Sequence, residues 1–430
     1  MEEEAKKDKI SPFGRHGAIV FDEMSIQADV QMKQRNGQWE IIGVTGMKEI
    51  ESMTKSEKGV QLATHILQFL FLGNTGFRFP VCHFATTEAS SINLFESFWE
   101  CVDTLDMYGF TVRLCICDGA GVNRKFVSMH FDDNNKAEEA LFTTISPCSG
   151  KSLTFVMDPS HNFKKIRNAV EKSKTNGVKQ LAFDEEEILW AHLRKAYEYD
   201  ITHNSLQTHR HLTEDHFHLT STSKMRNYLA DDVLGEDMLN LVKVYQRHLR
   251  SKGGKAEELN LTILFLEKTS KLLKNFKHRS PYCSLEDTRF AENRECLNWL
   301  KSWESNATSQ SGLSKKDKHR RFLPDQSKFD VFSMILGFES FCQNMFDEFP
   351  GSGILTCRTN QDTLENFFCG ARSINGQNNN PTAAQYESGV NALTQMNYSG
   401  GNKSNCAVPL RYYKEGPLTK RAVDISELYL

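Results

Sequence analysis

Apolar residues in the first part of the chain follow the patterns of β-strands. Residues 17–44 carry β-branched and aromatic residues on either side of Asn36-Gly37, a dipeptide that favours a tight turn, so a β-hairpin is predicted there. Short apolar runs bounded by turn residues predict further strands. These runs are residues 65–73 (HILQFLFLG), 79–86 (FPVCHFAT), 112–117 (VRLCIC) and 152–160 (SLTFVMDPS), the last of which is expected to end in a turn.

A helix is predicted between these strands, from Ser91 to Gly109. Apolar residues recur there at helical spacing from Leu94 to Leu105, and Gly109 is placed to end the helix. The resulting order is strands, helix, strand, helix, strand. That order predicts an α/β fold in which helices pack on a mixed sheet.

The pattern changes to helical periodicity after Asp158. Most segments between about Glu171 and Glu348 are predicted to be helices, which makes this block all-α. The helical segments are residues 185–200, 238–249, 261–276, 294–304 and 329–346. Residues 305–322 are polar and basic and predict an exposed loop. The stretches NGQNNNP and SGGNKSN make the last part loop-rich.

Composition narrows the class of protein only modestly. The 430 residues are 39% hydrophobic and 25% charged, and the formal net charge of −3 argues neither for nor against a nucleic-acid partner. Eleven scattered cysteines and a start (MEEEAKKDK) without a signal-peptide core predict a reducing intracellular compartment. The longest apolar run, residues 66–72, is too short to cross a bilayer, so no membrane partner is expected.

Four carboxylates are candidates for chemistry. Asp22 and Asp118 each follow an apolar strand, and adjacent strand ends in a sheet bring such residues together. Asp362 and Glu365 lie three positions apart in NQDTLENFF and would share one face of a helix. Three carboxylates that converge make an oxygen-rich site suited to Mg²⁺, and two such ions support phosphodiester chemistry. Taken singly, an aspartate after a strand is more often only a solvated end.

Six ordered segments resemble the catalytic part of P-element-like transposases, including the relatives that carry a THAP zinc-finger domain. They are FDEMSI (21–26), CDGAGVNRKF (117–126), DPSHNFKKIRN (158–168), the W-x-H-L-x-x-A-Y segment (190–197), LNWLKSWE (297–304) and NQDTLENFFCGAR with NNNPT (360–382). The resemblance implies an RNase H-like DDE fold interrupted by a large helical insertion. It divides the chain into an RNase H-like first part (10–172), the insertion (173–345) and an RNase H-like C-terminal part (346–430).

The resemblance also implies a set of catalytic residues. Asp22, Asp118 and Glu365 match the three catalytic, metal-binding carboxylates of the family, which hold two Mg²⁺ ions. His161 matches a motif position near the active site, although a structural role at a helix start explains it as well. The implied activity is Mg²⁺-dependent cleavage and strand transfer on transposon-end and target DNA, by a nuclear protein that could act as a homo-oligomer.

The family's insertion binds GTP, and the chain departs from that pattern. His211 stands where the family has a lysine, and Asn227 and Gly235 replace two further contacts. Lys274 and Lys277 occupy the positions of a guanine-binding Asp and Asn, and a lysine has no acceptor for the guanine edge. Of the nucleotide contacts only Asp362 is kept, so loss of GTP dependence is expected.

A second hypothesis is a domesticated or decayed transposase that binds DNA or protein without catalysis. Nothing before Asp22 supplies the Cys and His cluster of a zinc-finger domain, which favours this alternative. The three carboxylates favour a working enzyme.

Several other features have plain structural explanations beside functional ones. The histidines at 203, 209, 211, 216 and 218 follow no zinc spacing, and Cys115 and Cys117 are expected to be small buried residues. The basic runs 164–174 and 315–321 could contact phosphates or direct nuclear import, but such runs are more often solvated faces.

Overall fold

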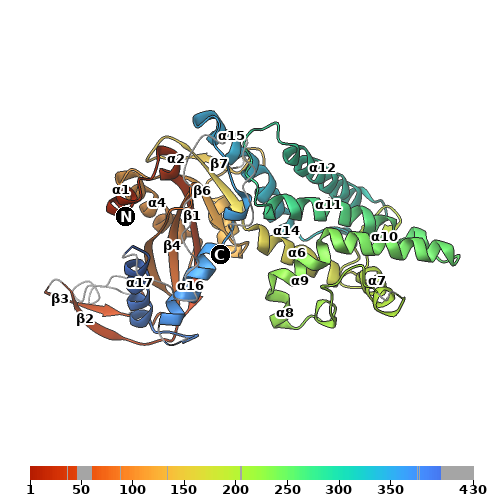
Figure 1. Ribbon diagram of the computed structural model, residues 1–430, viewed down its shortest axis with the longest axis horizontal. Coiled ribbons are helices and arrows are strands. Elements are labelled where there is room, and N and C mark those ends of the chain that lie inside the picture. The colour runs from red at the N-terminus through yellow and green to blue at the C-terminus, as the bar shows by residue number, and fades with distance from the viewer. Residues whose placement is uncertain are drawn as a thin grey trace.

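Six strands form one mixed sheet in the computed structural model, which describes residues 1–35, 37–45, 61–87, 89–132, 134–203, 206–374, 376 and 378–398 (Figure 1). In spatial order they are β5 (Arg78–Thr86), β4 (His65–Gly73), β1 (His16–Ser25), β6 (Thr111–Cys117), β8 (Ser152–Met157) and β7 (Thr143–Ile145). β1, β6 and β8 run parallel, whereas β4, β5 and β7 pair antiparallel with their neighbours. The predicted α/β class with a mixed sheet is confirmed.

Two strand predictions need correction. The hairpin predicted over residues 17–44 is limited to β2 (Gln31–Arg35) and β3 (Gln38–Ile42), because the apolar first part of that stretch joins the central sheet as β1. Asn36 lies outside the described residues. The strand predicted for 152–160 stops at Met157, and a helix rather than a turn follows, because Asp158 caps its first amides.

Helices cover both faces of the sheet. On one face lie α4 (Ser91–Met107) and α5 (Gly121–Ser128), whose Phe98 and Phe126 pack edge-on against each other and on Phe155 of β8. The next side chain of β8, Val156, points to the other face. There it meets Gly337, whose Cα approaches the strand so closely that a Cβ would lie 3.2 Å from Val156 Cγ2. α4 ends before Gly109, which has a positive φ of 74°, as expected.

The middle of the chain forms a helical lobe beside the sheet (Figure 1). α6 (Pro159–Glu171) leads from the sheet into it. The helices that follow are α7 (Trp190–His203), α8 (Ser221–Met225), α9 (Asn227–Leu234), α10 (Glu236–Ser251), α11 (Asn260–Lys277), α12 (Thr288–Ser309) and α13 (Lys315–Arg320). α14 (Asp325–Phe332), a π-helical segment (Ser333–Gly337) and α15 (Phe338–Glu348) return the chain to the sheet, where Ser333 Oγ donates to Phe155 O at 2.9 Å.

Local sequence misled three predictions in and after this lobe. The helix expected from residue 185 starts only at Trp190, because β9 (Ala182–Phe183) and β10 (Glu186–Glu187) form a short hairpin. The expected loop 305–322 contains the end of α12 and the exposed helix α13, which Ser314 caps. The C-terminal part is less loop-rich than predicted, because α17 (Ala383–Tyr398) follows α16 (Asp362–Ile374). The SGGNKSN stretch lies outside the described residues.

No helix in the described part of the chain is long and apolar enough to span a membrane. Cys115 and Cys117 are buried to at least 99%, as predicted for small core residues.

Candidate active site

Two aspartates lie on neighbouring parallel strands. Asp118 directly follows β6, as predicted, whereas Asp22 lies within β1, which continues to Ser25. The register of β1 and β6 places Val20 opposite Ile116. Asp22 and Asp118 lie two residues further along each strand direction and are therefore level with each other. The sheet thus brings together two carboxylates that are far apart in the sequence.

The turn after β6 fixes the direction of the Asp118 carboxylate. Its Oδ1 accepts hydrogen bonds from Ala120 N at 2.9 Å and from Asn123 Nδ2 at 2.6 Å. Oδ2 faces the start of α6, where His161 Nδ1 lies 3.8 Å away. One oxygen is therefore held by the turn while the other points toward the neighbouring histidine.

His161 lies among three carboxylates. α6 begins at Pro159 because the Asp158 side chain accepts from the amides of Ser160 and His161, at 3.1 and 3.3 Å. This cap places the imidazole on the first turn, with Nε2 3.6 Å from Glu365 Oε1 and 3.9 Å from Asp158 Oδ2. The ring therefore connects the helix that bears Glu365 to the end of β6.

Glu365 reaches the site because its helix is anchored to β1. Gln361, buried to 99%, donates from Nε2 to Phe21 O at 2.9 Å, next to Asp22 in the chain. The Gln361 carbonyl then accepts from Glu365 N at 3.0 Å and starts the helix. Leu364, Phe368 and Ala371 face the core, and Glu365 lies on the opposite, open side.

The charges in this cluster shift one another's pKa values. Burial, with a further contribution from the Asp118 charge, raises the pKa of Asp22 to about 7. The nearby His161 holds the pKa of Glu365 below its usual value. Burial lowers the pKa of His161, but Glu365 and Asp158 outweigh it, so the pKa lies above the usual value. The site therefore favours an imidazolium at His161 beside the Glu365 carboxylate.

A stability measurement tests the Asp22 environment. The carboxyl has a pKa near 3.8 when unfolded and about 7 when folded, so the folded state binds more protons between these values and stability falls as the pH rises through that window. In metal-free buffer at pH 8, Asp22→Asn should raise the free energy of unfolding by about 0.5–2 kcal/mol. The gain should shrink toward pH 4. A gain of equal size at pH 4 and pH 8, measured by urea unfolding, would contradict the assigned environment.

The oxygen donors of Asp22, Asp118 and Glu365 fit a hard divalent cation, although the three side chains do not converge on one position in this structure. In the described ranges, no group of three or more His, Cys, Asp or Glu side chains is placed closely enough to hold a metal ion. Asp22, Asp118 and Glu365 nevertheless supply only oxygen donors, which Mg²⁺ prefers. The Asp118 and Glu365 charges also raise the pKa of Asp22, by less than burial does. A cation that these carboxylates share would relieve that repulsion.

A buried ion-pair cluster holds the Asp118 turn, and the sequence patterns missed it. Asp330 of α14 is fully buried and accepts from Lys165 Nζ at 2.7 Å and from Arg124 at 3.0 Å. Lys165 also donates to Gly119 O at 2.8 Å, and Arg124 donates to the same oxygen. A Cβ at Gly119 would overlap with Asp330 and Lys165, so only glycine fits. A carboxylate inside the apolar run FDVF is the one signal that could have revealed Asp330.

Asp362 lies one turn before Glu365 and has different neighbours. Its Oδ2 accepts from Asn360 Nδ2 at 2.8 Å. Burial raises its pKa, with a smaller contribution from the Glu365 charge. Lys277, at the end of α11, lies near enough to interact with Asp362 electrostatically and forms an ion pair with Asp231 of α9. Asp362 thus faces the helical lobe.

Four residues of the basic run 164–174 and of the histidine group are buried. In the run 164–174, Lys164 and Arg167 are buried, so for these two both the phosphate-contact and the solvated-face hypotheses are wrong. Arg167 donates to Lys224 O at 3.0 Å. His209 and His216 are also buried and bond to Asp232, through its carbonyl and its carboxylate, so both have structural roles.

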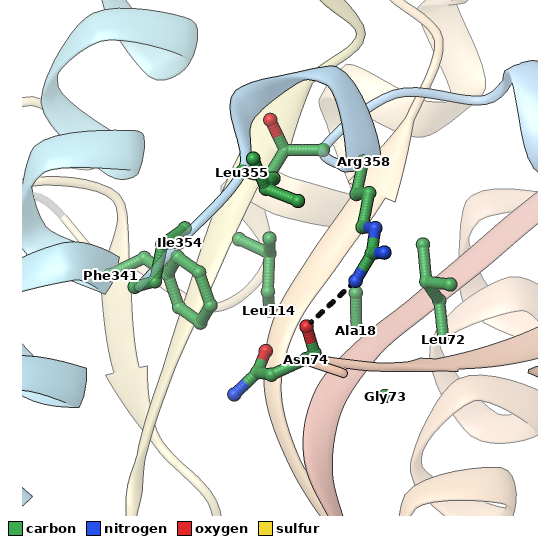
Figure 2. Close-up of a pocket in the computed structure, with 10 residues that line it drawn as sticks. Ala18, Leu72, Gly73, Asn74, Leu114, Phe341, Ile354, Leu355 and Arg358 are labelled. Carbon is green, nitrogen blue, oxygen red and sulfur yellow. Dashed lines mark hydrogen bonds between the residues drawn. The ribbon is translucent and has the colours of Figure 1, made fainter. Parts of the chain in front are cut away.

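A small cavity elsewhere on the sheet is too small for a substrate. It lies between Ala18, Leu72 and Leu114 of the sheet and the segment around Arg358, whose guanidinium donates to Asn74 O at 3.2 Å (Figure 2). Its volume is about 30 Å³, enough for about one or two water molecules. It is a packing defect between the sheet and the C-terminal segment rather than a binding site.

Comparisons with known proteins agree with the fold. Residues 1–130 match the family described as TNP-like, RNase H N-terminal domain, and residues 357–389 match TNP-like, RNase H C-terminal domain. The "Drosophila P element transposase strand transfer complex" contains a chain with the same fold, at a TM-score of 0.68 and 16% identity. The match covers 92% of this chain and 80% of that chain.

A search of curated protein sequences finds no match. The two family matches contain Asp22, Asp118 and Glu365, and they flank the helical lobe in the sequence. The chain therefore has an RNase H-like fold divided by a helical lobe, the fold of the P element transposase chain, and its two flanking parts match the TNP-like RNase H domains.

Proposed function

We propose that this chain is a DDE transposase core, which cleaves DNA strands and joins them to target DNA. The observation that carries the proposal is that Asp118 and Glu365 flank His161, while Asp22 lies level with Asp118 at one edge of an RNase H-like sheet. Transposon ends and target DNA are the proposed partners. The proposed location is the nucleus, and a homo-oligomer is the proposed working form.

The residues have distinct parts in this chemistry. Two Mg²⁺ ions bound by the three carboxylates would activate the attacking oxygen and stabilise the leaving 3′ oxygen of the phosphodiester. Asp22 and Asp118 give fixed oxygen donors on the sheet, and Glu365 supplies the third from a separate helix. His161 holds Glu365 and, as an imidazolium, offsets part of the negative charge near Asp118.

Incubation of the purified chain with DNA from the flanks of its gene, with and without Mg²⁺, tests this function. Cleavage that needs Mg²⁺, followed by joining of the new 3′ ends to a plasmid, is the expected result. DNA binding without cleavage would instead support the alternative of a domesticated or decayed transposase. The absence of both binding and cleavage would refute the proposal.

We further propose that the chain works without GTP. Lys277 is paired with Asp231, and Lys274 lies 3.3 Å from Glu236. By the resemblance, these two lysines occupy the positions of the family's guanine contacts, where a base would need acceptors. Asp362 accepts from Asn360 within its own segment. Both lysines therefore already have carboxylate partners within the chain.

Calorimetric titration of GTP into the chain is expected to give no binding heat at micromolar concentrations. GTP should also leave the melting temperature unchanged, because only a ligand that binds the folded state raises it. Cleavage rates with and without GTP should be equal. A micromolar dissociation constant in the titration would refute this proposal while leaving the transposase assignment intact.

A further inference from the structure

Two cysteines from different elements touch where α4 packs on the sheet. Cys82 of β5 and Cys101 of α4 have Sγ atoms 2.7 Å apart, and both are free thiols in this structure. A disulfide bond is about 2.04 Å long, so the two sulfur atoms lie only about 0.7 Å further apart than a covalent bond requires. Neither cysteine belongs to the candidate active site.

The backbone of Cys82 is fixed on the edge strand of the sheet. β5 carries one extra residue, Val81, which forms a β-bulge directly before Cys82. The Cys82 carbonyl accepts from Nε2 of the buried Gln68 at 2.9 Å. The Tyr386 hydroxyl donates to the other end of the same amide at 2.8 Å. These contacts hold the Cys82 backbone in one position.

Cys101 lies on the face of α4 that packs on the sheet. It is only 2% exposed, and Leu94, Phe98 and Leu105 are buried on the same face of the helix. The Ser90 side chain caps the start of α4. Because strand and helix are both fixed, the thiols are held in contact, and a bond between them needs only a small adjustment of the two side chains.

The two thiols differ in their access to an oxidant. Cys82 is partly exposed, whereas Cys101 is buried. The hydrogen bond with Cys82, together with burial, raises the pKa of Cys101 well above its usual value. Cys101 therefore stays a thiol, and a dissolved oxidant reaches the Cys82 sulfur first.

We propose that Cys82 and Cys101 form a site of reversible oxidation, at which hydrogen peroxide joins them in a disulfide that ties α4 to the edge strand β5. The Cys82 thiolate attacks one peroxide oxygen, the O–O bond breaks, and Cys82 becomes a sulfenic acid while the other oxygen leaves as hydroxide and is protonated to water. Cys101 Sγ then attacks Cys82 Sγ, the S–O bond breaks, and the leaving hydroxide takes the Cys101 proton to form a second water. The two sulfur atoms lose two electrons and the peroxide gains them, and a thiol reductant reverses the reaction.

Mass spectrometry of the full chain tests this site. The reduced protein is treated with hydrogen peroxide, the remaining thiols are alkylated, and the chain is cut with trypsin. Both cysteines lie in one tryptic peptide, residues 79–113, because no Lys or Arg stands between Arg78 and Arg113. After peroxide this peptide should carry no alkyl group, and the pieces made by further cleavage at glutamate should stay joined until a thiol reductant is added.

Three outcomes of this experiment would overturn the proposal. They are alkylation of both cysteines after peroxide treatment, a modified Cys82 beside an alkylated Cys101, and pieces that separate before reduction. Cys283→Ser is the matched control, because that thiol is exposed and lies between α11 and α12. Its peptide 79–113 should be joined to the same extent as in the unsubstituted chain.

The melting temperature gives a second readout. Peroxide should raise the melting temperature of the unsubstituted chain by a few degrees, because a disulfide restricts the unfolded chain. Cys82→Ser and Cys101→Ala each remove one of the two sulfur atoms, so peroxide should give neither variant this rise. A rise of equal size in both variants and in the unsubstituted chain would contradict the assignment. The proposal and its test are independent of DNA cleavage.

Discussion

Replacement of Glu365 by glutamine is expected to abolish Mg²⁺-dependent cleavage of DNA, with a rate loss of at least about 1,000-fold. The amide has the same shape but lacks the negative charge that a divalent cation needs, and it also weakens the contact with His161. Asp22→Asn and Asp118→Asn should lose activity to a similar extent, because the three carboxylates act as one unit. Rates are compared over a range of Mg²⁺ concentrations on the same end DNA.

Asp362→Asn is the matched control for this series. The residue lies on the same helix and carries the same charge, but it binds Asn360 and faces the helical lobe. Its variant should keep cleavage within a few-fold of the unsubstituted rate. Equal activity of the unsubstituted chain and all three carboxylate variants would show that these residues do not form the catalytic site. Melting curves of each variant establish that the fold is retained.

The sequence predicted those parts of the fold whose signals are local. β4, β5, β6 and α4 were predicted within one or two residues, because each is a buried run or an amphipathic repeat bounded by turn residues. The first strand was misassigned to a hairpin because Asn36-Gly37 is a strong turn signal, whereas β1 pairs with β4 and β6, forty or more residues away. No short stretch of sequence carries a signal for strand pairing over such distances.

The candidate site was predictable in part for the same reason. Asp22 and Asp118 follow apolar strands, and motif resemblance pointed to Glu365 on its helix. The groups that orient them were not predictable, because Gln361 and Asp330 act through contacts with distant backbone atoms, at Phe21 and around Gly119. Local pattern therefore identifies the carboxylates, and tertiary packing decides where they point.

Asp330→Ala is expected to lower the free energy of unfolding by about 3–5 kcal/mol, because it leaves the charges of Arg124 and Lys165 without their buried partner. Glu198→Ala, which breaks an exposed pair with Arg194, should cost only about 0.5 kcal/mol. Urea unfolding measures both. A loss at Asp330 no larger than that at Glu198 would show that the buried cluster adds little to stability.

A triple variant separates the energy of the cluster from its effect on the Asp118 turn. When Asp330→Leu is combined with Arg124→Met and Lys165→Met, no unpaired charge remains, and apolar groups of similar size should recover much of the lost stability. The rate of DNA cleavage by the triple variant should be low, because the Gly119 carbonyl has lost both donors and the turn no longer fixes Asp118. Recovery of both stability and cleavage would mean that the turn holds its shape without the cluster.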